Sequence, residues 1–258
     1  MKYTVLTLFP EITNAFFANS IMAKAIKRGI IEYRAVNIRD FAYDKHKTCD
    51  DAPYGGGPGM LMLPEPLGLA IKSVLPDENQ TQESKKPRVI YLSPSGRLFN
   101  QEIARELAVE QELILICGRY EGIDQRIIDR YVDDEISVGD YVLSSGEVAA
   151  LAVIDATYRL VDSVICAESL TEESFSDGLL EYPQYTRPEN YDRIKVPEVL
   201  LSGHHEQIRL WRLEKRVEKT LQQRPDLIQY GKDLGVFSKE IIKLIDHLSE
   251  NPIDEEGE

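Results

Sequence analysis

Apolar runs alternate with segments of helical periodicity between residues 2 and 160 of the chain. Short runs rich in leucine, β-branched and aromatic residues are typical of buried strands, and they cover residues 2–9, 30–38, 88–92, 113–117 and 135–138. Helical spacing or capping signals mark residues 10–29, 64–74, 100–112, 123–131 and 146–160. This order predicts an α/β fold, in which helical crossovers connect the strands of a parallel sheet.

The pattern changes after residue 161. Residues 162–175 are polar and irregular, which is typical of a linker, and helical periodicity returns at residues 206–223 and 238–249. We therefore predict a first domain over residues 1–161, a linker over 162–175, and a smaller, mainly helical domain over 176–258.

Two glycine-containing segments, residues 116–124 and 137–147, each follow a strand-like run and precede a helical one. Residues 93–96, Ser-Pro-Ser-Gly, are a third candidate turn after the run at 88–92. Parallel sheets bind ligands at the carboxyl ends of their strands, and glycine lets the backbone approach a ligand closely. These turns are therefore predicted to be neighbouring walls of one small-molecule site.

Residues 40–60 form a long polar stretch that includes the sequence Gly-Gly-Gly-Pro-Gly at residues 55–59. A loop of this length in a compact domain is either a flexible surface loop or a functional one. The functional interpretation is a substrate-binding loop whose backbone amides meet a phosphate or a base. A nucleotide-binding P-loop follows a strand, ends in Gly-Lys-Ser/Thr and leads into a helix. Residues 40–60 lack this order, so we exclude a P-loop.

The predicted helix at residues 146–160 is apolar almost all round, so it needs burial on more than one face. It is either a central core helix or part of an interface between two copies of the chain.

The composition is that of a soluble globular protein, with 258 residues of which 43% are hydrophobic and 29% charged. No apolar run approaches the roughly 18 residues of a membrane span, and no signal sequence is recognisable. The three cysteines are far apart, which argues against a disulfide framework or a zinc site. We predict a cytoplasmic protein with no membrane partner and no protein-held metal.

The net charge of −14 disfavours nucleic acid, because phosphate binding needs Lys and Arg. Residues 208–224 nevertheless concentrate basic side chains, so an acidic body carries a basic stripe. Arg187, Arg209, Arg212 and Arg216 are candidate RNA contacts, with a solvated basic face as the alternative. Trp211 lies at helical spacing from other apolar residues and is predicted to face a core rather than RNA. His204 and His205 are adjacent, which suits a helix start or the surface better than a metal site.

The order of these motifs resembles the bacterial tRNA (guanine-N1)-methyltransferases, which are S-adenosylmethionine enzymes of the SPOUT superfamily. The resemblance rests on residues 117–124 and 137–147 and extends over nearly the whole chain, through residues 8–11, 53–60, 182–188 and 199–203. It implies a parallel sheet with a deep trefoil knot between about residues 92 and 160, followed by a helical tRNA-binding domain. It also implies methylation of guanine 37 of tRNA and a homodimer whose sites are built from both chains, to which residues 40–60 contribute. A requirement for Mg²⁺ is left open.

The resemblance also implies which residues hold the S-adenosylmethionine cofactor. They are Leu92, Ser93, Pro94, Gly118, Tyr120, Glu121, Ser137, Val138, Gly139, Asp140, Tyr141, Val142, Leu143, Ser145 and Gly146. In this scheme Leu92, Tyr120, Ile123, Tyr141 and Leu143 form an apolar floor, and Glu121 lies near the positive charge of the donor. A sulfonium donor has no pyrophosphate, so the absence of a GxGxxG helix start is consistent with it.

Methylation of guanine N1 requires loss of the N1 proton, so a carboxylate base and a cation near O6 are expected. Matching the family's linker motif at Ser174 and Phe175 places Glu173 as the base, with Glu172 and Asp177 as alternatives. Arg159 matches the family's arginine and is the predicted stabiliser of the guanine anion.

The chain departs from the family pattern at two positions. Glu173 stands where the family has Asp, and Ser145 stands where it has Gly. Two alternatives therefore remain: a knotted methyltransferase that acts on another RNA, and an RNA-binding protein that has lost catalysis.

Overall fold

The computed structural model of the chain describes residues 1–76, 86–165 and 173–250. The chain divides into two compact units, residues 1–165 and 166–258. The division falls inside the segment predicted to be a linker. Across the described residues, no helix is both long and apolar enough to cross a membrane.

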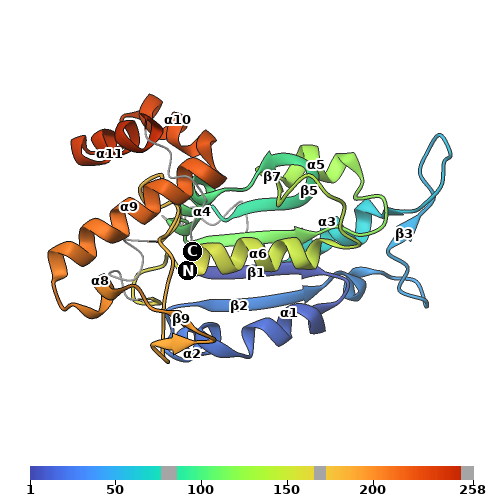
Figure 1. Ribbon diagram of the computed structural model, residues 1–258. Helices are drawn as coiled ribbons and strands as arrows, with labels where there is room; N and C mark the ends of the chain where they lie inside the picture. The colour runs from blue at the N-terminus through green and yellow to red at the C-terminus, as the bar shows by residue number, and fades with distance from the viewer. Residues whose placement is uncertain (77–85, 166–172, 251–258) are drawn as a thin grey trace. The chain divides into compact units, whose positions relative to one another are not determined.

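A five-stranded sheet forms the centre of the first unit (Figure 1), with the order β2-β1-β6-β5-β7. All four neighbouring pairs are parallel, which confirms the predicted parallel α/β architecture. The strands are β1 (Lys2–Thr7), β2 (Glu32–Asn37), β5 (Arg88–Leu98), β6 (Glu112–Cys117) and β7 (Asp134–Ser137).

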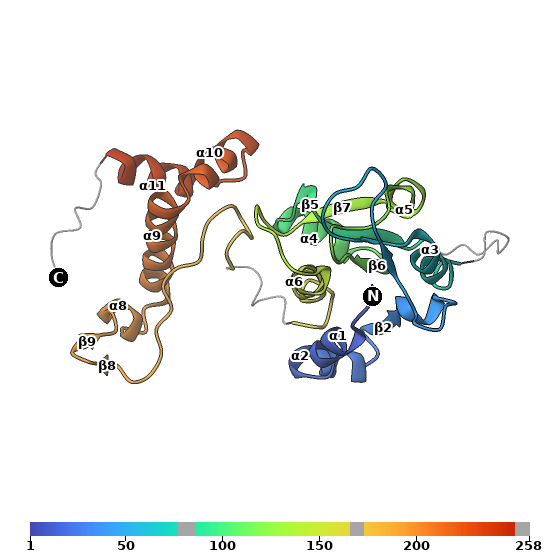
Figure 2. The same cartoon turned by 90° about the vertical axis from the view of Figure 1, so that its right-hand side faces the viewer.

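Helices cover both faces of this sheet (Figure 2), because its strands are apolar on both sides. One face packs against α1 (Pro10–Phe17), α2 (Ser20–Lys27), α4 (Gln101–Ala108) and α6 (Gly146–Tyr158). The other face packs against α3 (Pro64–Lys72), α5 (Gln125–Tyr131) and the 3-10 turn Ile38–Phe41. The result is a three-layer α/β/α unit with a separate apolar core on each side of the sheet.

The single helix predicted at residues 10–29 is two helices, α1 and α2, separated near Asn19. Ser20 has a φ of +58°, which a continuing helix does not allow. Ile12 and Ile21, which belong to the apolar pattern of residues 10–29, are each 41% exposed. Phe17 and Met22 are buried instead.

Strand β5 is longer than predicted, because the expected turn at residues 93–96 remains part of it. β5 pairs with β7 through Leu92, is interrupted by an irregularity, and pairs again from Arg97. A Cβ atom at Gly96 would collide with the backbone at Glu135 and Ile136, so the absence of a side chain is what permits this second pairing.

Helix α4 begins where it was predicted and ends earlier. The Asn100 side chain caps it by accepting a hydrogen bond from the Ile103 N–H (3.0 Å). The helix ends at Ala108 rather than at Glu112, which is instead the first residue of β6.

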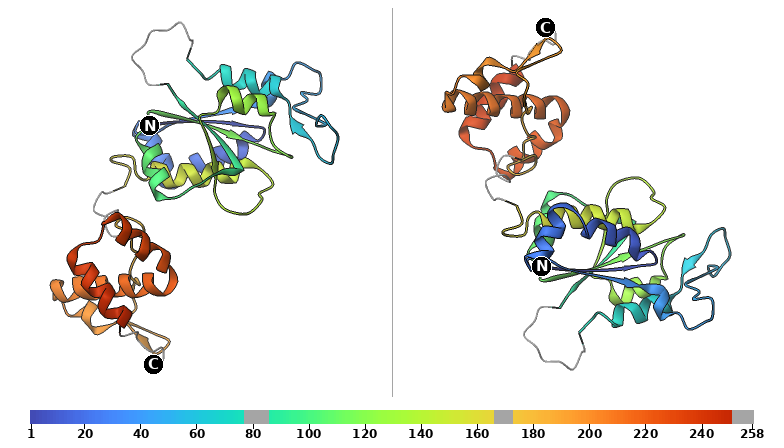
Figure 3. Two further views of the ribbon diagram at one scale, coloured as in Figure 1. Left: turned by 90° about the horizontal axis from the view of Figure 1, so that it is seen from above. Right: turned by 90° about the horizontal axis from the view of Figure 1, so that it is seen from below.

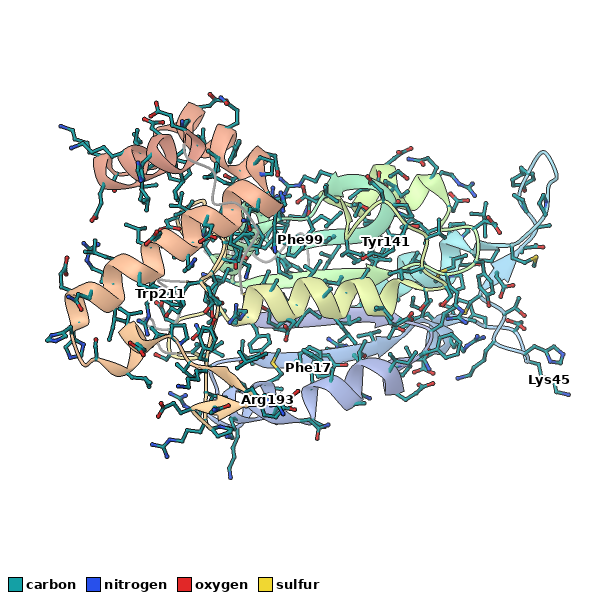
Figure 4. The ribbon with its side chains drawn as sticks, viewed as in Figure 1. Phe17, Lys45, Phe99, Tyr141, Arg193 and Trp211 are labelled. Carbon is teal, nitrogen blue, oxygen red and sulfur yellow. The ribbon has the colours of Figure 1, made fainter. Side chains whose placement is uncertain are left out.

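The long polar segment at residues 40–60 projects from the edge of the unit that holds the carboxyl ends of the strands (Figure 3), and Lys45 lies near its outer end (Figure 4). Within it, β3 (Asp50–Asp51) pairs antiparallel with β4 (Leu61–Met62), which directly follows the segment.

Helices dominate the described part of the second unit. It contains the hairpin strands β8 (Asn190–Tyr191) and β9 (Ile194–Lys195) and the helices α8 (Glu198–Leu201), α9 (His205–Gln223), α10 (Pro225–Leu234) and α11 (Lys239–Glu250). Its own core contains Leu179, Val217, Ile228, Phe237, Ile241, Ile245 and Leu248.

Candidate functional site

A cavity of about 590 Å³ opens beside the middle of β5 and the carboxyl ends of β6 and β7. Its walls are residues 91–95, 118–123 and 137–146, which overlap the three segments singled out in the sequence, 93–96, 116–124 and 137–147. The predicted ligand-contacting residues that line it are Leu92, Ser93, Pro94, Gly118, Tyr120, Glu121, Ser137, Val138, Gly139, Tyr141, Val142, Leu143, Ser145 and Gly146. Asp140 belongs to the same turn but does not line the cavity.

The 118–123 and 137–146 walls touch each other at Gly146. The Gly146 N–H donates to the Gly118 carbonyl (2.8 Å), and Arg119 and Ser145 form a β-bridge beside that bond. A Cβ atom on Gly146 would lie 2.8 Å from both Cys117 Cα and Gly118 N, so only glycine allows this approach. The start of α6 is therefore held against the end of β6.

The five residues predicted to form an apolar floor differ in how deeply they are buried. Leu92 and Ile123 are buried and form the base of the cavity. Tyr120, Tyr141 and Leu143 instead stand on its rim, and Tyr141 is 56% exposed. Aromatic side chains that line a cavity while remaining this exposed can bury further surface when a ligand binds.

The glycine-rich loop supports the outer wall of the cavity. The Met62 N–H donates to the Gly122 carbonyl, and the Glu121 N–H donates to the Met60 carbonyl, each at 3.0 Å. The Glu121 side chain packs directly on Gly59, in space that a side chain at position 59 would need. Residues 55–62 and the 118–123 turn are therefore one structural element.

Charged side chains in the cavity lining come from three positions, Arg119, Glu121 and Glu135. The Arg119 guanidinium lies over the Phe9 ring, 4.6 Å from its centroid, which fixes the arginine at the rim. Burial, with a smaller effect of the negative Glu135, raises the pKa of the Tyr91 phenol above its usual value. Tyr91 therefore remains a neutral hydrogen-bonding group beneath the 118–123 turn at physiological pH.

The two predicted catalytic residues lie in different units. Arg159 is the residue that ends α6 in the first unit. Glu173 lies in the second unit, where its backbone carbonyl accepts hydrogen bonds from Ser176 N–H (3.1 Å) and Ser176 Oγ (2.7 Å). Their roles remain predictions. Of the alternative bases, Glu172 lies outside the described residues, and Asp177 forms an ion pair with the buried Arg216.

A second cavity, of about 430 Å³, belongs to the second unit. Tyr182, Tyr185, Arg187 and Arg212 are among its lining residues. The Arg212 guanidinium lies over the Tyr182 ring at 4.7 Å, and the Tyr185 ring contacts Trp211 at 6.3 Å between centroids. Trp211, on α9 (Figure 4), is thus half-buried beside an exposed tyrosine rather than part of the unit's main core.

The other candidate RNA contacts differ in their exposure to solvent and in their ion pairs. Arg216 is buried and pairs with Asp177, so it supports the unit's own fold. Arg209 pairs with Glu206 and Glu240 at the surface, whereas Arg187 is exposed at the second cavity. His204 and His205 are exposed at the start of α9, as predicted. Within the described ranges, no cluster of three His, Cys, Asp or Glu side chains is arranged to hold a metal ion.

Sequence reasoning missed Tyr91, Arg119 and Glu135 as lining residues. Tyr91 and Glu135 lie within strands, and the alternation of a strand does not show which of its last residues reaches a cavity. Arg119 lay inside the recognised 116–124 motif, and its position next to Gly118 is the signal that could have identified it.

The parallel sheet and the cavity at its edge define an α/β protein with a site of the size and lining that small organic ligands occupy. Residues 1–230 match the family model described as tRNA (Guanine-1)-methyltransferase TrmD. The chain belongs to this family, which confirms the resemblance seen in the sequence.

Curated relatives carry the same description. A protein named tRNA (guanine-N(1)-)-methyltransferase from Treponema denticola is 63% identical over 245 residues, which cover 95% of this chain and 98% of the relative. Proteins with that name from Treponema pallidum and Borreliella burgdorferi are 57% and 59% identical, over 96% and 93% of this chain and 96% and 100% of their own lengths.

Proposed function

We propose that this protein transfers a methyl group from S-adenosylmethionine to N1 of guanine 37 in tRNA. The observation that carries the proposal is the cavity between β5 and the ends of β6 and β7, in a chain whose relatives are named tRNA (guanine-N(1)-)-methyltransferase.

The residues present fit S-adenosylmethionine. A volume of about 590 Å³ lies within the range of small-molecule cofactor sites. The backbone of the 118–123 and 137–146 turns offers hydrogen-bonding groups for an adenine and a ribose, and Leu92 and Ile123 offer an apolar base. When bound, the cofactor supplies an electrophilic methyl group on a positively charged sulfur.

Two residues complete the proposed chemistry. Glu173 takes the N1 proton, and Arg159 stabilises the negative charge that develops on the guanine. Asp177, the described alternative base, forms an ion pair with Arg216.

The second unit is proposed to bind the tRNA. Its cavity combines Tyr182 and Tyr185 with Arg187 and Arg212, and aromatic rings and arginines are the groups that hold unstacked RNA bases and phosphates. A homodimer is also proposed, since Tyr141, Val142 and Val148 leave apolar surface exposed beside the first cavity. The contact between residues 117–119 and 145–146 is compatible with the knotted topology that the family resemblance implies.

The test is methyl transfer from labelled S-adenosylmethionine to tRNA transcripts that carry guanine or adenine at position 37, with the methylated base identified. N1-methylguanine on the guanine transcript alone supports the function, and its loss in Glu173→Ala supports the base. A loss in Asp177→Ala but not in Glu173→Ala would transfer the role of base to Asp177. Repeating the assay with a chelator tests the requirement for Mg²⁺.

No transfer by a folded protein that binds the donor would refute the enzymatic proposal. Retained tRNA binding in that case would favour the alternative of an RNA-binding protein without catalysis.

A further inference from the structure

Glu147 is a buried carboxylate whose hydrogen bonding is incomplete. It is the second residue of α6 and is 1% exposed. Its Oε1 accepts a hydrogen bond from Thr7 Oγ1 at the end of β1 (2.5 Å). Its Oε2 is buried and has no hydrogen-bond partner among the residues that the structure describes.

Such an arrangement is costly, because a buried charge without a cation loses the solvation that water gave it. In the described part of the chain, no lysine or arginine forms an ion pair with Glu147. The N-terminus of α6 provides a partial positive charge, which offsets only part of the loss. A positive charge supplied by a ligand would offset more of it.

Glu147 does not line the first cavity, but it follows the wall residue Gly146 in the chain, and the Gly146 N–H donates to the Gly118 carbonyl on the neighbouring wall (2.8 Å). The Glu147 carboxylate lies at the end of β1, the strand beside β6. The field of Glu147 reaches the end of β6: the pKa of the Cys117 thiol is raised well above its usual value, first by burial and then by the negative charge of Glu147. Cys117 directly precedes Gly118.

Most of the charged side chains that line the cavity are negative, like Glu147. Two of the three charged lining residues, Glu121 and Glu135, are acidic, and only Arg119 is basic. Glu147 adds a further negative charge behind this lining. A cationic ligand is therefore favoured over a neutral ligand of the same shape.

We propose that Glu147 is a specificity-determining residue whose buried charge makes the cavity prefer a sulfonium ligand to the uncharged thioether that remains after methyl transfer. The inference rests on the proposed function. In the proposed reaction the electron pair of guanine N1 would form a bond to the methyl carbon while the bond from sulfur to that carbon breaks. The electron pair of the broken bond would stay on sulfur, which thereby loses its positive charge. Glu147 thus weakens binding of the product relative to the donor, without touching either one.

The test compares equilibrium binding of S-adenosylmethionine and S-adenosylhomocysteine to the full-length protein by calorimetry, without tRNA. The measured quantity is the ratio of the thioether Kd to the sulfonium Kd. Glu147→Gln keeps an oxygen acceptor for Thr7 and removes the charge. The ratio is expected to fall about fivefold in this variant, because the field of a unit charge is partly screened inside a protein.

Thr7→Val is the matched control. It removes the hydrogen bond to Glu147 and keeps the charge, so it is expected to lower stability while leaving the ratio unchanged. If Glu147 served only to stabilise the start of α6, both Kd values would change by the same factor in Glu147→Gln and the ratio would stay constant. That result would overturn the proposal.

Two further measurements do not depend on how well the Glu147 variant folds. A wild-type protein that binds the two ligands equally tightly would overturn the proposal directly. If the wild-type preference for the sulfonium disappears completely in Glu121→Gln or Glu135→Gln, the preference comes from the lining carboxylates. That result would also overturn the proposal for Glu147. Because these are binding measurements, their outcome is independent of whether methyl transfer to tRNA is observed.

Discussion

Replacing Gly146 with alanine should damage the first cavity. The new Cβ would lie 2.8 Å from Cys117 Cα and Gly118 N, and backbone atoms in the middle of a sheet cannot move aside as a side chain can. Overpacking of this kind costs ~1–3 kcal/mol, and a weakened hydrogen bond from Gly146 to Gly118 adds about 1 kcal/mol. The higher helix propensity of alanine returns roughly 1 kcal/mol.

The net loss of stability is therefore on the order of 2 kcal/mol, which corresponds to a fall in Tm of roughly 4–8 °C for a unit of this size. Calorimetry should also show S-adenosylmethionine binding weakened about tenfold or more, because relief of the clash separates two walls of the cavity. Gly68→Ala is the control: it adds the same methyl group inside α3, where the nearest atom outside the helix is Ile127 Cδ1, at the end of a side chain, at 3.3 Å. Wild-type binding and wild-type Tm in Gly146→Ala would refute the argument.

Three further predictions follow from other contacts. Asn100→Ala should lower the stability of the first unit by about 1 kcal/mol in urea unfolding, because the Ile103 N–H loses its cap, and Asn100→Asp should restore it. Hydrogen bonds from Arg97 and Arg88 hold the pKa of Glu106 below its usual value, so this carboxylate contributes stability above the ordinary carboxyl pKa and loses it as the pH falls through the lowered value. Acid unfolding of Glu106→Gln should then show a shallower dependence on pH, and an unchanged profile would contradict the assignment. Tyr185→Ala should weaken tRNA binding severalfold in filter binding while leaving S-adenosylmethionine binding unchanged, and equal losses for both ligands would argue against a role in RNA recognition.

The strands of the first unit could be predicted because burial on both faces leaves continuous apolar runs in the sequence. Runs such as residues 113–117 are too apolar to be stable anywhere but the interior of a sheet. The walls of the candidate site could be predicted for a related reason. Turns after parallel strands must lie at one edge of the sheet, and their motifs resembled a known family.

Features that depend on contacts between distant segments could not be predicted. The extension of β5 past residue 92 depends on the fit between Gly96 and the backbone of β7, which no local pattern encodes. Glu147 is buried against Thr7, which is hydrogen-bonded to it but lies 140 residues earlier in the sequence. A glutamate at the start of a helix is ordinarily a solvated residue that interacts favourably with the helix dipole, so no local pattern places it inside the protein.

The order of the strands also constrains how the protein is made. β6 lies at the centre of the sheet, between β1 and β5, although it is the fourth of the five strands to be synthesised. When β1 and β2 leave the ribosome, β1 therefore has one exposed edge and no partner for it until residues 112–117 have followed. Pairing across so many residues makes folding slow and leaves an apolar strand edge open during translation. Nascent chains cut short before residue 112 should consequently depend on chaperones far more than chains that extend past residue 117.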